Sequence, residues 1–128
     1  MKIAVRVWAD TLEWFIGVAV LGGRMGRSRL PVENGGDESL CLFIEPYGED
    51  YWLKPGEVFT VAPEVEGIDV WFSTVVWKGG ITVWPYEDGD PVKIVMEYTV
   101  SDANGTRLEC GHQRPPGQRF SAAGPLVD

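Results

Sequence analysis

The sequence predicts an all-β protein, an antiparallel β-sandwich or barrel with little helix, and three observations support this. Eight or more short apolar runs are separated by turn signals about 8 to 12 residues apart. Almost no segment repeats its apolar residues at the helical period. The 128 residues are 45% hydrophobic, 12% aromatic and 23% charged, which suits one globular domain spanning residues 1–128.

The first 28 residues are expected to form a basic arm and a glycine-rich connection. Residues 2–8 alternate apolar and polar side chains, the period-2 pattern of a half-buried strand. Residues 10–13 fit either a capping box that opens a short helix or the turn before a second strand at 14–21. The β-branched residues of that run favour the strand slightly. The segment 22–28 is rich in glycine and arginine and is interpreted as an exposed loop.

Residues 29–112 are expected to form an acidic β core. Glycine-containing turn motifs separate its apolar runs, and the Pro55-Gly56 pair predicts a type II turn. The expected strands span residues 30–33, 39–45, 51–53, 58–62, 68–72, 75–77, 81–84, 92–100 and 106–110. The last segment, 113–128, holds two clusters of proline and glycine and is expected to be an irregular tail.

Charge is distributed unevenly along the chain. The formal net charge is −8. Residues 1–29 hold five basic and two acidic side chains, a net +3, so the remaining residues carry −11. An acidic chain repels phosphate groups, so we expect no nucleic-acid partner and an attraction for cationic partners instead. No apolar window reaches the roughly 18 residues of a membrane span, so we expect none.

The cysteine pattern argues against a disulfide framework and a metal site. Cys41 and Cys110 form no CxxC motif, and His112 is the only histidine. We therefore expect free buried thiols, no metal and no cofactor. Acidic residues interrupt the start of the apolar stretch 14–21, and no small-residue cleavage site follows it. We interpret that stretch as structure and expect a cytoplasmic protein.

Three motifs in the first half of the core resemble cupredoxin-like Greek-key sandwiches. They are Val32-Glu-Asn-Gly, Leu42-Phe-Ile-Glu-Pro-Tyr-Gly and Leu53-Lys-Pro-Gly-Glu-Val-Phe-Thr-Val. In that family an asparagine-containing turn and a Leu-x-Pro-Gly-Glu turn bracket an edge hairpin. The resemblance implies a topology and no copper, because a type 1 site needs two histidines and the chain has one.

The best candidate ligand site is where carboxylates and aromatic rings interleave, in residues 45–52 and 84–88. Ring faces attract an ammonium or guanidinium group, and carboxylates supply the counter-charge. The predicted ligand-binding residues are Glu45, Tyr47, Glu49, Asp50, Trp52, Trp84, Tyr86 and Asp88. The alternative is that both clusters are hairpin turns whose rings cover the ends of the sandwich.

His112 is a candidate acid or base. It stands two positions after Cys110, so in an extended strand the two side chains would share a face. The alternative is a surface histidine that bonds a loop carbonyl.

Six tryptophans exceed what a core of this size needs. If side chains alternate, Trp71, Trp77 and Trp84 cannot all point inward together with Phe72, so some indole rings are expected on an outer sheet face. There they would line a groove or be covered by another chain, or else cover the sheet ends of a monomer. We expect a homodimer with the first 21 residues in its interface, the alternative being that the N-terminal strand joins its own sheet.

These observations leave three classes of function. The first is a binding module for a cationic, partly apolar small molecule or peptide. The second is a peptide-tailoring enzyme that positions and deprotonates an amine. In size and acidity the chain is similar to the small lysinoalanine-forming proteins of lantibiotic clusters, which implies cross-link formation in natural-product biosynthesis. The third is an immunity-like or subunit interaction protein.

Overall fold

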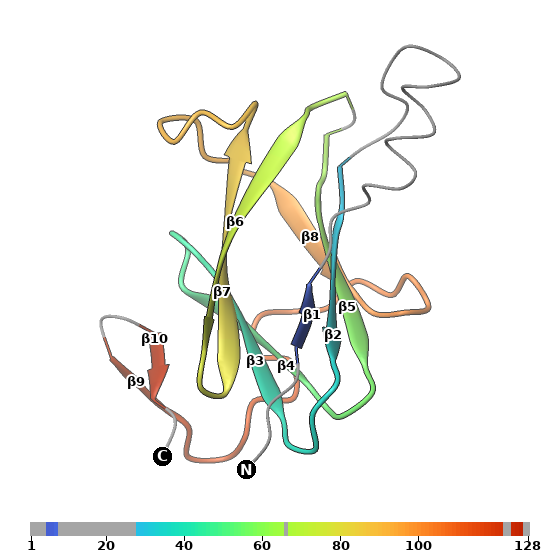
Figure 1. The fold of residues 1–128 in the computed structure, drawn as a ribbon, viewed down its shortest axis with the longest axis vertical. Helices are drawn as coiled ribbons and strands as arrows, with labels where there is room; N and C mark the ends of the chain where they lie inside the picture. The colour runs from blue at the N-terminus through green and yellow to red at the C-terminus, as the bar shows by residue number, and fades with distance from the viewer. Residues whose placement is uncertain (1–4, 8–27, 66, 122–123, 127–128) are drawn as a thin grey trace.

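The expected all-β class is confirmed. The structure is a computed structural model that describes residues 5–7, 28–65, 67–121 and 124–126. These ranges contain strands and no helix, hence no helix long and apolar enough to cross a membrane. The strands form two four-stranded sheets and one small hairpin rather than a closed barrel (Figure 1).

The two large sheets differ in strand direction. The first has the order β1 (Val5–Val7), β2 (Leu30–Asn34), β5 (Val58–Pro63) and β8 (Tyr98–Ser101), all antiparallel. The second has the order β4 (Glu49–Leu53), β3 (Leu40–Ile44), β7 (Gly80–Glu87) and β6 (Val70–Trp77). Its central pair, β3 and β7, is parallel, and both outer pairs are antiparallel. β9 (Arg119–Ser121) and β10 (Gly124–Leu126) pair separately.

The main hydrophobic core lies between these sheets. Leu42 and Ile44 of β3 meet Phe59 and Val61 of β5, and each is at most 1% exposed. Every second residue of β3 takes part, as strand geometry requires. Burial from both sheets makes this fold a β-sandwich, and transfer of such side chains from water is the main stabilising term.

A second cluster lies on the outer face of the β3–β4 pair. Cys41, Phe43 and Trp52 are buried there, and Trp77 packs against them. The C-terminal segment touches this face, since a Cβ added at Gly124 would lie 3.2 Å from the Phe43 ring. β3 is therefore buried on both faces, which explains its uninterrupted apolar sequence.

The expected turn at Pro55-Gly56 is confirmed. Gly56 has a φ of +84°, the left-handed value that the third residue of a type II turn requires. The Glu57 backbone N–H donates to the Lys54 carbonyl at 3.0 Å and closes the turn. This turn leads the chain from β4 of one sheet to β5 of the other.

Two expected strand boundaries are wrong in the second half of the core. Residues 68–72 and 75–77 belong to one continuous strand, β6, because the polar residues between the two runs continue the ladder with β7. Residues 92–97 are not a strand, and only Ile94 forms a bridge there, to Tyr86. Val92 and Met96 are 88% and 75% exposed, whereas Val95 is buried, so only part of this apolar run faces the core.

The C-terminal expectations also need correction. Residues 106–110 contribute one isolated bridge, between Arg107 and Ser101, and no strand. The segment 113–128 contains the β9–β10 hairpin and is not wholly irregular. Of the strand expected at residues 2–8, the structure describes only residues 5–7, and these form β1. The apolar run at 14–21 lies outside the described residues.

Candidate functional site

A pocket of about 360 Å³ lies where the β4 edge of one sheet meets the β8 edge of the other. Its wall combines phenol rings and carboxylates. The tyrosines are Tyr47, Tyr51 and Tyr98, and the glutamates are Glu49, Glu64, Glu97 and Glu109. Residues from both sheets therefore build a single acidic, aromatic concavity.

Local structure explains how the first of these side chains reach the pocket. Glu49 and Tyr51 are two positions apart on β4, so both point to the inner side of the sheet. Tyr47 precedes them in the turn after β3, where the Gly48 N–H donates to the Ile44 carbonyl at 3.0 Å. Gly48 has a φ of +68°, which glycine adopts at little cost.

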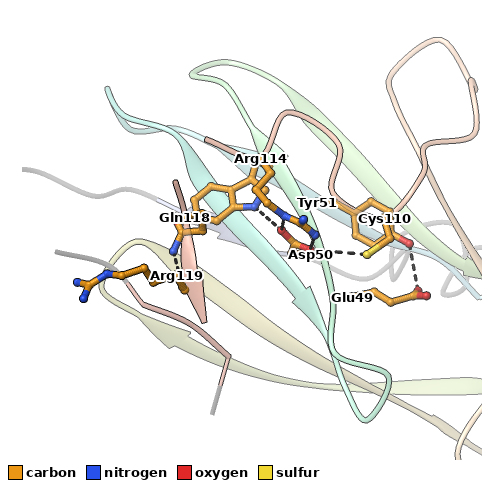
Figure 2. A network of polar contacts seen from close by, with 8 residues as sticks. Glu49, Asp50, Tyr51, Cys110, Arg114, Gln118 and Arg119 are labelled. Atoms are coloured by element: carbon orange, nitrogen blue, oxygen red, sulfur yellow. Dashed lines mark hydrogen bonds and ion pairs between the residues drawn. The ribbon is translucent and has the colours of Figure 1, made fainter. Parts of the chain in front are cut away.

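Two tyrosines hold one oxygen of the Glu49 carboxylate. The Tyr51 hydroxyl donates to Glu49 Oε1 at 3.2 Å, as Figure 2 shows, and the Tyr98 hydroxyl donates to the same atom. Burial and the neighbouring Glu49 raise the pKa of both tyrosines, so both hydroxyls stay protonated donors at neutral pH. No other described residue donates a hydrogen bond to Glu49, and its Oε2 is left for another partner.

Tyr47 forms an aromatic wall with Tyr98. Their ring centroids are 5.5 Å apart and the ring planes are inclined at 32°. The Tyr47 hydroxyl donates to the Val95 carbonyl and lies 3.7 Å from the Met96 sulfur. These contacts tie the turn after β3 to the segment before β8, so the two rings are held beside Glu49.

The pocket carries a net negative charge. Four glutamates and one arginine line it, which gives −4 plus 1, or −3, at neutral pH. Arg107 Nη1 lies 2.9 Å from Glu64 Oε1, but the Arg107 side chain is 63% exposed, so this ion pair contributes little to stability. The site is therefore chemically suited to a cation.

Asp50 lies on the opposite face of β4 and is 1% exposed. Arg114 donates to both of its oxygens, from Nε at 2.8 Å and from Nη2 at 2.6 Å (Figure 2). Trp52 Nε1 donates to Oδ2 at 2.8 Å, and the Cys110 thiol lies 3.6 Å from Oδ1. Burial acts to raise the pKa of Asp50, but the hydrogen bonds from Arg114 and Trp52 outweigh it and lower the pKa.

The Asp50 cluster fastens the C-terminal segment to the sheet. The Gly111 N–H donates to the Asp50 carbonyl at 2.6 Å, and the Trp52 N–H donates to the His112 carbonyl at 2.9 Å. The Arg114 guanidinium also lies 5.1 Å from the Phe120 ring centroid. Asp50 is thus a structural clamp whose charge is already neutralised by Arg114.

Four of the predicted ligand residues come from this part of β4 and its preceding turn. Tyr47 and Glu49 line the pocket. Asp50 and Trp52 are buried on the other face, where Asp50 accepts hydrogen bonds from Arg114 and from the Trp52 indole. The predicted cluster is therefore split by the alternation of the strand.

The other four predicted ligand residues lie away from the pocket. Trp84 and Tyr86 are half-buried on β7, where their rings stack with centroids 6.2 Å apart. Asp88 is exposed in the turn after β7, and Glu45 follows β3 half-buried. Trp71 of β6 is 61% exposed and is paired with Tyr86 in the ladder, so the expectation of an indole ring on an outer face is confirmed.

His112, the candidate acid or base, contacts an aromatic ring of the core. The His112 ring lies edge-on to Phe59, with centroids 5.6 Å apart, and no hydrogen bond joins it to Cys110 in the described part of the chain. Cys41 is buried as expected, but Cys110 is exposed, which corrects the expectation of two buried thiols. Burial raises the pKa of each thiol. Within the described ranges no three His, Cys, Asp or Glu side chains are grouped to hold a metal ion.

Sequence reasoning missed Tyr98, Met96 and Glu109 as pocket residues. A signal was present, because Glu97 and Tyr98 form another pair of carboxylate and ring. This signal was overlooked because residues 92–100 were expected to form one continuous strand. The bend that exposes Met96 is not part of such a strand. The distance of 49 positions between Glu49 and Tyr98 leaves no local pattern to connect them.

Comparison of the chain with protein-family models, with curated proteins and with solved structures found no significant match. The fold and the site define the class: an all-β sandwich protein with an acidic, tyrosine-lined pocket. Function is therefore argued from the chemistry of that pocket.

Proposed function

We propose that this protein binds a small organic cation with an apolar part, either free or as a side chain of a peptide, in the pocket between β4 and β8. One observation carries the proposal. Two tyrosines engage one oxygen of Glu49, and Oε2 has no partner among the residues that the structure describes, in a pocket with a net charge of −3. An ammonium or guanidinium group supplies the donors that Oε2 lacks.

The remaining pocket walls suit the apolar part of such a ligand. Tyr47 and Tyr98 offer ring faces, to which cations are attracted by the ring quadrupole. Met96 is 75% exposed and its flexible thioether adapts to apolar groups of different shape. These side chains favour an amphipathic cation over a bare metal ion.

Pocket size limits the ligand class. A volume of about 360 Å³ is at the small end of the usual 300 to 1,000 Å³ for ligand sites. This suits a lysine or arginine side chain or a small aromatic amine. The net charge of −8 on the whole chain attracts such cations over longer distances.

Isothermal titration calorimetry tests the proposal with three probes: phenethylammonium, agmatine and the anion phenylacetate. We expect the two cations to bind and phenylacetate not to bind. Glu49→Gln keeps the shape of the side chain and removes its charge, so the affinity for the cations should fall roughly tenfold or more. Glu38→Gln, an exposed acid outside the pocket, is the matched control and should bind as the wild type does.

Two results would contradict the proposal. One is binding of phenylacetate as tight as that of phenethylammonium, and the other is unchanged cation affinity in Glu49→Gln. The peptide-tailoring alternative stays a prediction. A peptide that carries both a lysine and a dehydroalanine tests it. Addition of the lysine amine to the alkene leaves the mass unchanged, so cross-linking is detected by tandem mass spectrometry as the loss of fragment ions between the two residues, which a binding module would not cause.

A further inference from the structure

In the described part of the chain, β6 is an open edge of the second sheet, at the side opposite to the pocket. The β4 edge is covered by the chain itself, since the Trp52 N–H donates to the His112 carbonyl at 2.9 Å. The β8 edge is covered too, by the Leu108 N–H, which donates to the Val100 carbonyl at 2.7 Å. β1 has three residues, whereas β6 has eight.

The sequence of β6 contains none of the residue types that usually keep an edge strand from pairing with another chain. Residues 70–77 include no charged residue, no proline and no glycine, and are mostly β-branched or aromatic. Trp71, Val75 and Val76 are 61%, 55% and 60% exposed. Long, apolar, uncharged edges tend to pair with another strand, and monomeric proteins usually block them.

The register of β6 identifies which backbone groups are available. The hairpin to β7 closes at the pair Trp77 and Gly80, so every second residue counted back from Trp77 bonds to β7. The N–H and C=O groups of Phe72, Thr74 and Val76 therefore point away from β7. At Val70 the outward N–H already donates to the Ser28 hydroxyl, at 3.1 Å. Among the described residues the other three have no partner on that side.

We propose that β6 pairs antiparallel with β6 of a second copy of this chain, about a two-fold axis at Thr74. In this register Phe72 faces the partner subunit's Val76, and Thr74 faces the partner subunit's Thr74. Each of these pairs exchanges two backbone hydrogen bonds, so all the available groups are used. A shift by one pair in one direction would need Val70, whose N–H is taken, and a shift in the other direction would set Phe72 opposite Lys78, which lies in the turn after β6.

Charge complementarity favours a second copy in this orientation. Asp69 stands just before β6 and Lys78 just after it, and both are exposed. Antiparallel pairing sets Lys78 opposite the partner subunit's Val70, next to the partner subunit's Asp69. The same contact recurs at the other end because a two-fold interface is isologous. Parallel pairing would instead bring like charges together.

The same arrangement would also bury side chains of β6 that are exposed on the two faces of the sheet. Trp71 comes opposite the partner subunit's Trp77, an aromatic cross-strand pair. Val76 and Phe72 meet on the other face. β4 and β6 are opposite edges of the sheet, so the pocket stays open in the dimer. The inference is thus independent of the proposed function.

Sedimentation velocity on the full-length chain tests the pairing over a concentration series. Thr74→Pro removes an outward N–H without loss of a bond to β7, and Val76→Lys adds a charge at the interface. Val92→Lys is the matched control, because Val92 is an exposed valine outside β6. We expect the wild type and Val92→Lys to be dimeric and the two β6 variants to be monomeric, with unchanged far-UV circular dichroism.

Hydrogen exchange on the wild-type dimer needs no variant and locates the interface. The amides of Phe72, Thr74 and Val76 should exchange more slowly as the protein concentration rises. The inference is overturned if the wild type is monomeric at every concentration, or if folded Thr74→Pro and Val76→Lys remain dimeric. It is also overturned by a dimer in which these amides stay unprotected, which would place the interface elsewhere, for example in the first 21 residues.

Discussion

The guanidinium of Arg114 holds both carboxylate oxygens of the buried Asp50, at 2.6 and 2.8 Å, across 64 positions of the chain. Trp52 adds a third donor to the same carboxylate, at 2.8 Å. Paired and hydrogen-bonded, the carboxylate is tolerated in a site from which water is excluded. Because Arg114 belongs to the C-terminal segment, this contact makes that segment part of the sandwich.

Replacement of Asp50 by asparagine should destabilise the protein strongly. The asparagine amide carries no negative charge to balance the positive charge of Arg114. It also has one hydrogen-bond acceptor atom, whereas the carboxylate has two. We expect a loss of about 2 to 4 kcal/mol in the free energy of unfolding, somewhat less than for a fully buried ion pair, because the Arg114 side chain is 41% exposed. Urea unfolding followed by tryptophan fluorescence measures it. Arg107→Gln, which breaks the exposed pair with Glu64, should cost less than about 1 kcal/mol.

The same carboxylate predicts a loss of stability in acid. The pKa of Asp50 is lower in the folded protein than in the unfolded chain, so folding favours its ionised form. This contribution is fully present above the unfolded pKa of about 3.9 and is lost as the pH falls through the folded pKa. Unfolding free energies measured from neutral pH down to strongly acidic pH should show this decline. In Asp50→Asn the decline should be smaller, and equal declines would contradict the assignment.

Asn34, the last residue of β2, provides a second test of the fold. It is 2% exposed, and its Nδ2 donates to the Glu38 and Leu53 carbonyls at 2.8 and 2.9 Å. Asn34→Asp would set a carboxylate oxygen against two carbonyl oxygens, so we expect thermal unfolding at lower temperature, with a loss of about 2 kcal/mol or more. Asn104→Asp is the control, because that side chain is exposed and has no such bonds to the residues that the structure describes. Equal effects of the two substitutions would argue against the buried role of Asn34.

The cysteines should differ in reactivity toward a thiol reagent such as Ellman's reagent. Cys110 is exposed and Cys41 is buried, so the native protein should react at one thiol and the denatured protein at both. Burial raises the pKa of Cys110, so its reaction should be slow at neutral pH and faster at alkaline pH. Cys110→Ser should abolish labelling of the native protein. Labelling of that variant without unfolding would show that Cys41 is accessible.

Local patterns in the sequence predict much of the fold and little of the site. The Pro55-Gly56 pair specifies its turn, but the strand expected at residues 51–53 begins at Glu49, and this extension sets Glu49 and Tyr51 on one face of β4. Alternation also puts Asp50 on the other face, which separates residues that are neighbours in the sequence. The partners of Glu49 and Asp50, which are Tyr98 and Arg114, come from distant segments. No spacing or propensity specifies such pairs, because they depend on how the two sheets and the C-terminal segment pack.

The central claim is that an organic cation binds beside Glu49 and not on the outer aromatic face at Trp84. Nuclear magnetic resonance distinguishes these places in one titration of isotopically labelled protein with phenethylammonium. Among the described residues no tryptophan lines the pocket, so we expect shifts of the Met96 methyl and Tyr98 amide signals while the indole N–H signals of Trp71 and Trp84 stay fixed. Movement of those indole signals, with Met96 and Tyr98 unchanged, would contradict the claim.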